Sequence, residues 1–373
     1  MRRLLASAAP LLILLLVTAS PAAVVTVDDD GGADYAVIQD AVDSASWGDT
    51  VLVHPGTYTA VEDLWCGGYG SPVCVCIRGA LTLTSSGGPG VTTIDGEGKV
   101  VCGVMAEWGD PVVIEGFTIT NGPQSYWGDA AVVLDAGVVR NNILIGFSTG
   151  VSTDMMWYWP GSVEPRRTRG AAVVIEGNDI ACYSGGLYLR TWSSSRTDVV
   201  GNTIHGGHDV GVSVYGVGDI LFVDNEVSGN EVGVHIRNPS RTVGVQFSID
   251  MFSNQIIDNT ERNLDIRLSD INPGSACDIT IGGSMENAND CYGAPTSLKL
   301  VTYDYDVFVY ATHNYWGSVA CTTFVPLFDI AESFPETAFV FEPFIDESHL
   351  VTYDCQGVPV RESSWGAIKA LYR

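Results

Sequence analysis

Apolar and polar residues alternate along most of the chain in short runs. The stretches GGLYLR, GVSVYG, GVHIRN and NLDIRL begin at residues 185, 211, 233 and 263. In each stretch a small residue or Asn comes first, and apolar and polar side chains then alternate. A period of two is typical of a β-strand with one buried face. Gly, Asn and Asp turns separate the runs and helical periodicity is scarce, so the sequence predicts an all-β fold.

An asparagine recurs before a second set of short strands. The stretches NNILIG, GNDIAC, GNTIHG, DNEVSG and SNQIID place it at Asn142, Asn178, Asn202, Asn225 and Asn254, with gaps of 36, 24, 23 and 29 residues. EGFTITNG fits one repeat earlier, with Gly116 in the asparagine position. A repeat near 23 residues with three short strands and no helix is one coil of a solenoid, which buries its apolar side chains by stacking on the next coil. We therefore expect the asparagines to form a structural ladder about 4.8 Å per step.

The N-terminal stretch DDDGGADYAVIQDAVDSASWGDTVLVHPGTYTA resembles the opening segment of right-handed parallel β-helix proteins of the pectin-lyase-like superfamily. The GNTI…GVSV stretches are similar to the coil pattern of that superfamily (PbH1 repeats), and HNYWGS followed by FEPFID resembles its closing segment. The resemblance implies a right-handed parallel β-helix whose open end is capped by a short helix. Ile38, Ala41, Val42 and Ala45 fall on one face of such a helix. It implies no single activity, because this fold hosts lyases, hydrolases, isomerases and non-catalytic surface proteins.

Both ends of the chain differ from the repeats. Arg2 and Arg3 precede the apolar run 11–17, and small residues follow at 20–22, so residues 1–22 are predicted to be a signal peptide of a secreted or cell-surface protein. We expect the β-helix over 23–345 and an appendage over 346–373. The end of the appendage, WGAIKALYR, resembles a tail of some exported bacterial proteins, which leaves envelope attachment or a frayed terminus open. No later stretch reaches the ~20 apolar residues of a membrane span.

The net charge limits the classes of partner that the protein can bind, and the cysteines bear on the redox compartment in which it folds. Lys and Arg total 18 and Asp and Glu total 44, a net charge of −26, which excludes nucleic acid as a favoured partner. An oxidising compartment permits disulfides among the nine cysteines. Plausible pairs are Cys277–Cys291, Cys321–Cys355 and Cys66 with Cys74 or Cys76, and Cys182 is expected in the core. An odd count leaves at least one cysteine unpaired within the chain.

Aligning the coils on residues 150, 186, 211, 233 and 263 predicts two outward columns of side chains. The first column contains Ser152, Tyr188, Ser213, His235 and Asp265, and the second contains Asp154, Arg190, Tyr215, Arg237 and Arg267. Three arginines in one column are unexpected in so acidic a chain, and Arg is well shaped to bind carboxylates. Trp157, Trp159 and Trp192 follow in the loops that leave this face. We therefore predict that an acidic, uronate-containing polysaccharide binds here.

The chemistry at this face is left open by the sequence. The resemblance implies that polysaccharide lyases of this fold use Arg or Lys as a base, often with calcium held by Asp, but no calcium-binding Asp cluster is visible and no metal ligand is assigned. Glycoside hydrolases need two carboxylates about 5–9.5 Å apart, and no outward pair lies on adjacent coils. For either class, His235 and Arg237 are the candidate catalytic residues. Alternatively, Asp265 neutralises Arg237 or Arg267, and the chain is a non-catalytic surface or interaction protein with the solenoid as a rigid scaffold.

Overall fold

The computed structural model describes a large part of the chain. The described residues are 22–60, 64–66, 71–107, 109–123, 128–153, 172–191, 196–207, 209–216, 218–237, 246–268, 276–302, 307–318, 323, 328–330, 339–340, 344–345, 347–348 and 352–353. Residues 1–21 of the predicted signal peptide and the C-terminal WGAIKALYR tail therefore lie outside the described residues, and both assignments stay predictions. Within the described residues, no helix combines the length and the apolar character that crossing a bilayer requires.

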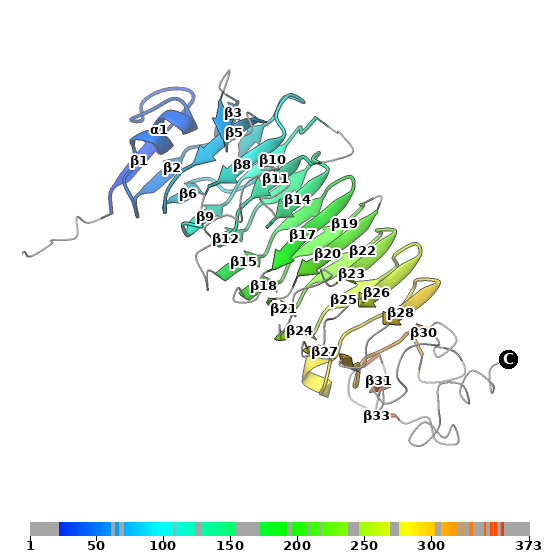
Figure 1. Ribbon diagram of the computed structural model, residues 1–373. Helices are drawn as coiled ribbons and strands as arrows, with labels where there is room; N and C mark the ends of the chain where they lie inside the picture. Colours follow the sequence, from blue (N-terminus) through cyan, green and yellow to red (C-terminus); the bar gives the residue numbers. More distant parts are fainter. Residues whose placement is uncertain are drawn as a thin grey trace, which may run out of the picture.

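Three long sheets run side by side along the molecule (Figure 1). The 12-stranded sheet contains, in order, β1 (Val24–Val27), β2 (Thr50–Val53), β6 (Thr82–Ser85), β9 (Val112–Glu115), β12 (Gly137–Arg140), β15 (Ala172–Glu176), β18 (Arg196–Val200), β21 (Asp219–Val223), β24 (Gln246–Phe252), β27 (Ala276–Ile281), β29 (Val307–Tyr310) and β31 (Phe339–Val340). The 8-stranded sheet contains β3 (Gly56–Thr59), β7 (Thr92–Asp95), β10 (Thr118–Thr120), β13 (Ile143–Ile145), β16 (Asp179–Ala181), β19 (Thr203–His205), β22 (Glu226–Ser228) and β25 (Gln255–Ile257).

The third sheet positions the candidate site. Its 11 strands are β4 (Trp65–Cys66), β5 (Ser71–Ile77), β8 (Cys102–Ala106), β11 (Ala130–Val133), β14 (Thr149–Ser152), β17 (Gly185–Thr191), β20 (Val210–Gly216), β23 (Val232–Arg237), β26 (Arg262–Leu268), β28 (Thr296–Thr302) and β30 (Phe328–Ile330). Only β4 pairs antiparallel within it. The short elements are α1 (Ile38–Ser44), a 3-10 turn at Met285–Asn287, and an antiparallel pair of β32 (Phe344–Ile345) and β33 (Thr352–Tyr353).

The coils from β2 to β26 each contribute one strand to each sheet, and each pairs in parallel with the coil before and after it. The coil of β18, β19 and β20, for example, is followed by the coil of β21, β22 and β23. Parallel crossovers are right-handed almost without exception. The molecule is thus a right-handed parallel β-helix, which confirms the predicted fold.

The predicted interior columns form the core. Val212 pairs in register with Val234, and Val214 pairs with Ile236. All four side chains are buried, and they belong to one apolar cluster that runs the length of the solenoid. At the N-terminal end, α1 buries Ile38, Ala41 and Val42 on the first coils, so the predicted capping helix is also confirmed (Figure 1).

The predicted asparagine ladder is present and is longer than expected. The backbone N–H of Asn142 donates to Asn178 Oδ1 at 3.0 Å, and Asn178 donates in the same way to Asn202. The chain of bonds continues through Asn225, Asn254 and Asn289 to Asn314. The assignment of Gly116 to this ladder is wrong: Thr118 is the register partner of Ile143, so Phe117 occupies the position, and its N–H donates to Asn142 Oδ1 at 3.0 Å.

The cysteines confirm part of the predicted pairing. Cys66 and Cys76 form a disulfide, one of the two pairings expected for Cys66, while Cys74 stays free and buried. The pair Cys277–Cys291 is wrong, because the free Cys291 thiol is buried in the core cluster. Cys182 is buried in that cluster, as predicted. Cys321 and Cys355 lie outside the described residues.

Candidate functional site

The described members of both outward columns lie in the predicted order. In the first, backbone register links Ser152 to Tyr188, Tyr188 to Ser213, Ser213 to His235, and His235 to Asp265. In the second, register links Arg190 to Tyr215, Tyr215 to Arg237, and Arg237 to Arg267. Successive members of a column are about 4.8 Å apart. We call the described part of these columns on β17, β20, β23 and β26 the basic strand face.

His235 and Arg237 contact each other directly. Arg237 Nε donates a hydrogen bond to His235 Nε2 at 2.7 Å. The histidine is buried whereas the arginine is exposed. Burial, together with the nearby Arg237, Arg267 and Arg262 charges, lowers the pKa of His235 to about 4 against the opposing effect of Asp265. The imidazole is therefore neutral near pH 7, with Nε2 acting as the acceptor for Arg237 and the ring proton on Nδ1.

Asp265 is the buried anion of the face. Its side chain is only 1% exposed. Arg267 donates to it twice, from Nε to Oδ1 at 2.8 Å and from Nη2 to Oδ2 at 2.7 Å, and Arg262 Nη1 lies 3.3 Å from Oδ2. Burial acts to raise the pKa of Asp265, but the hydrogen bonds from Arg267 and the surrounding positive charges outweigh it, so the pKa is lowered. Asp265 thus stays ionised and neutralises Arg267, as the alternative interpretation expected.

Two further contacts complete the face. The Arg190 guanidinium carbon lies 5.7 Å from the centre of the Tyr215 ring, which is a cation–π distance. In the next coils Lys299 is the register partner of Asp265, and Lys299 Nζ lies 2.7 Å from Asp329 Oδ2. Among the described residues, the ion pairs thus account for Arg262, Arg267 and Lys299, and no carboxylate pairs with Arg237.

Some predicted residues cannot be placed, and three contributors were missed. Asp154, Trp157, Trp159 and Trp192 lie outside the described residues. Arg262, Lys299 and Asp329 were not predicted. The stretch SLKLVT at 297–302 has the same alternation as the four quoted stretches, so extending the alignment by one coil would have found Lys299. Arg262 is the register partner of Val232, and an apolar position gave no signal for it.

The arrangement can bind an anion more readily than it can transfer a proton. Arg237 is an exposed cation whose Nη groups are not used by its contact with His235. A general base at His235 would need the Nε2 lone pair that Arg237 occupies, and a general acid there would need a proton that the imidazole lacks near pH 7. The catalytic roles of His235 and Arg237 therefore stay predictions.

The stacked coils define the class to which the chain belongs. It is a right-handed parallel β-helix protein of the pectin-lyase-like kind. The chain belongs to the family described as "Protein of unknown function (DUF1565)", which matches residues 77–268 and so includes the basic strand face. A search among curated proteins gave no significant match.

Solved structures with similar folds include two kinds of enzyme. The mannuronan C-5 epimerase AlgE6 A-module of Azotobacter vinelandii is 16% identical, with 83% of this chain and 93% of that chain covered and a TM-score of 0.41. Pectin methylesterase PemA from Erwinia chrysanthemi is 11% identical, with 84% and 93% covered and a TM-score of 0.41. At these identities and TM-scores, the likeness supports no conclusion about the activity of this chain.

Proposed function

We propose that this protein binds an acidic polysaccharide along the basic strand face. The observation that supports the proposal most directly is Arg237, an exposed guanidinium that no carboxylate neutralises among the described residues, in a chain of net charge −26. Isolated cations on an acidic surface concentrate anionic ligands, and a guanidinium matches the two oxygens of a carboxylate. Uronate sugars present such carboxylates.

The flanking aromatics suit the same ligand. Tyr188 and Tyr215 are partly buried and stand in neighbouring columns, with Tyr215 beneath Arg190. Tyr rings offer an apolar face to sugar C–H groups and a hydroxyl that can hydrogen-bond. Because coils repeat about every 4.8 Å, the face offers cationic and aromatic groups at intervals comparable to the length of one sugar unit. The proposal thus rests on these side chains and not on the names of similar structures.

A binding experiment tests the proposal. Calorimetric titration with polygalacturonate should show binding that weakens with added salt, whereas the neutral polysaccharide dextran should not bind. Arg237→Ala should lower the affinity about 10- to 100-fold, because a hydrogen bond between charged groups is worth roughly 1.5–3 kcal/mol. Arg196→Ala on β18 is the matched control, since Arg196 pairs with Asp198 on a different sheet. Equal effects of the two substitutions would place the ligand elsewhere.

Incubation with the same polysaccharides also tests whether the protein is an enzyme. A lyase would release unsaturated products that absorb in the ultraviolet, and a hydrolase would release reducing ends without that absorbance. If His235 transfers protons, His235→Ala should abolish turnover while polygalacturonate still binds. Binding without any product would limit the function to recognition.

The ion pairs favour one alternative. Asp265 with Arg267, and Lys299 with Asp329, form a neutralised wall of the kind expected from a rigid scaffold in a non-catalytic surface protein. Failure of the parent protein to bind any acidic polysaccharide would support this alternative and reject the proposal.

A further inference from the structure

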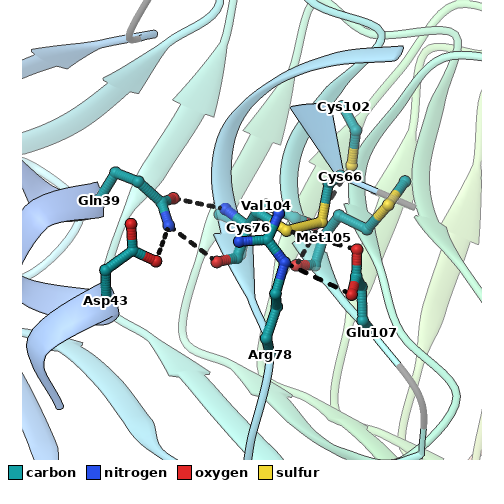
Figure 2. The surroundings of a disulfide bond; sticks show 9 residues. All are labelled: Gln39, Asp43, Cys66, Cys76, Arg78, Cys102, Val104, Met105 and Glu107. Atoms are coloured by element: carbon teal, nitrogen blue, oxygen red, sulfur yellow. Dashed lines mark hydrogen bonds and ion pairs between the residues drawn. A yellow bond between two sulfur atoms is a disulfide. The ribbon is translucent and has the colours of Figure 1, made fainter. Parts of the chain in front are cut away.

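Three metal-ligating side chains meet near the N-terminal end of the 11-stranded sheet, several coils away from the basic strand face (Figure 2). Cys66 ends β4, Cys76 lies in β5, and Glu107 follows β8. Their two sulfurs and a carboxylate oxygen lie within 4.8 Å of one another. All three residues are buried, with exposures of 2%, 0% and 8%. The described part of the chain holds no other group of three such ligands.

The carboxylate of Glu107 lies beside the disulfide and is paired with Arg78. A disulfide is uncharged and has no hydrogen to donate, whereas burying a carboxylate is costly unless a charge or a donor compensates. Glu107 Oε2 lies 3.6 Å from Arg78 Nε, and Glu107 Oε1 lies 3.7 Å from Cys76 Sγ. One carboxylate oxygen thus points to the arginine and the other to the sulfur pair (Figure 2).

These distances are close to those of a tetrahedral metal site. Zinc binds thiolate sulfur at about 2.3 Å and carboxylate oxygen at about 2.0 Å, so a sulfur and an oxygen on one zinc ion are separated by about 3.5 Å. Cys76 Sγ and Glu107 Oε1 are already 3.7 Å apart. Once the disulfide is reduced, only Cys66 Sγ has to turn away from Cys76 to open a position between the three ligands. The thioether of Met105, the register partner of Cys76, lies beside them (Figure 2).

Contacts other than the disulfide hold two of the three ligands, Cys76 and Glu107. Gln39 of α1 clamps the backbone of Cys76: its Oε1 accepts from Cys76 N at 2.8 Å, and its Nε2 donates to Cys76 O at 3.1 Å and to Asp43 Oδ1 at 2.8 Å (Figure 2). Arg78 forms an ion pair with Glu107 and so orients its carboxylate, as hydrogen-bonding partners of metal ligands commonly do. Two thiolates and one carboxylate carry three negative charges, which a divalent ion and Arg78 would balance.

We propose that, in the dithiol form, Cys66, Cys76 and Glu107 bind one thiophilic divalent ion of the zinc class, and that the disulfide is the closed, metal-free form of the same site. A dithiol reductant supplies two electrons and two protons to the Cys66–Cys76 bond and itself becomes a disulfide. The ion then displaces the two thiol protons and binds both thiolates. A low-molecular-weight disulfide reverses the step: it takes up two electrons from the two thiolates and becomes a dithiol, the Cys66–Cys76 bond forms again, and the ion is released.

Zinc titration of the full chain tests this site. The protein is reduced with a phosphine, which takes up the oxygen of water, and zinc is titrated against a chromophoric chelator. Reduced protein should bind one zinc ion per chain, and air-oxidised protein should bind none. Cobalt(II) in place of zinc should give the near-ultraviolet absorbance of thiolate ligation only after reduction.

Variants separate this site from the other cysteines. Glu107→Gln keeps both cysteines and should lower zinc affinity at least tenfold, whereas Glu115→Gln, at a carboxylate paired with Arg140, should leave it unchanged. Cys102→Ser, a buried thiol of the same outward cluster, should keep the stoichiometry. The double variant Cys66→Ser/Cys76→Ser should bind no zinc while its circular dichroism matches the parent. If that variant does not fold, Glu107→Gln decides. Absence of zinc binding by the reduced parent, or equal binding by Glu107→Gln, would overturn the proposal.

Discussion

The adjacent strands β23 and β26 each place an arginine two residues after another outward residue, but only one of the two arginines is neutralised. In β23, Arg237 turns back onto His235, and in β26, Arg267 turns back onto Asp265. The imidazole is neutral and the carboxylate is charged, so Arg267 is neutralised and Arg237 is not. A single difference at the outward position two residues before each arginine therefore decides which guanidinium is available to an anionic ligand.

This contrast predicts different effects on stability. Arg267→Ala should lower the free energy of unfolding by about 1–3 kcal/mol, because a buried carboxylate is left with Arg262 alone. Arg237→Ala should cost less than about 1 kcal/mol, since its guanidinium is exposed and neutralises no buried charge. Urea denaturation of the two variants beside the parent measures both values. An equal loss of unfolding free energy in the two variants would mean that Arg267 does not stabilise the buried carboxylate of Asp265.

The lowered pKa of His235 predicts a pH dependence of stability. In the unfolded chain this histidine takes up a proton around its ordinary pKa of 6.5, whereas in the folded protein it does so only near pH 4. The unfolded state therefore binds more protons between these values, and stability falls as the pH drops from about 6.5 to about 4. His235→Gln should remove this part of the fall, and His205→Gln, at a partly exposed histidine paired with Asp179, should not. A constant difference between parent and His235→Gln across that range would contradict the assignment.

At the scale of the elements, the asparagine ladder joins each coil to the next through its turns. Asn202 Oδ1 accepts from the N–H and the Nδ2 of Asn178, while its own Nδ2 donates to Ile175 O and to Asn225 Oδ1. One side chain therefore satisfies polar groups of three coils in a place that water does not reach.

Removing one step of the ladder should be costly. Asn202→Ala leaves several buried polar groups unsatisfied, and each costs about 1–3 kcal/mol. We expect thermal unfolding well below that of the parent, while Gln255→Ala, at an exposed position of β25, should unfold close to the parent temperature. If Asn202→Ala unfolds at the same temperature as Gln255→Ala, the ladder contributes little to stability.

At the scale of the whole molecule, one sheet presents two different outward faces. Near the N-terminus its outward residues Cys76, Met105 and Val133 are apolar and form a buried cluster with Cys66 and the neighbouring strands. From Ser152 onward the same column is polar, and it ends in charged residues. The covered apolar end holds the proposed metal site, and the basic strand face occupies the later coils. Because contacts in a solenoid are made mainly between neighbouring coils, the two sites can be tested independently.

The sequence by itself determined the solenoid, the capping helix and the order of both outward columns. Strands in a parallel β-helix stack in register, so alternation within each strand and the repeat between strands place a residue such as Arg237 beside Tyr215 and Arg267. The ladder was predicted for the same reason. The prediction failed at Phe117, where the repeat contains no asparagine to mark the position, and it ended before Asn289 and Asn314.

The tertiary structure alone decided which groups pair and which are buried. Cys74 and Cys76 are two residues apart, and simple alternation gives them one face, so either could pair with Cys66. In β5, Val73 and Val75 are the register partners of Cys102 and Val104 in β8. Strict alternation is interrupted between them: Cys74 and Val75 both lie in the core cluster, whereas Cys76 lies in the outward cluster and is bonded to Cys66. In the same way, His235 and Asp265 point away from the core yet are buried, which alternation along a strand does not predict. The arginines that bind them lie on the same strands, two or three residues away, so the stacking of the coils decides the burial and not the choice of partner.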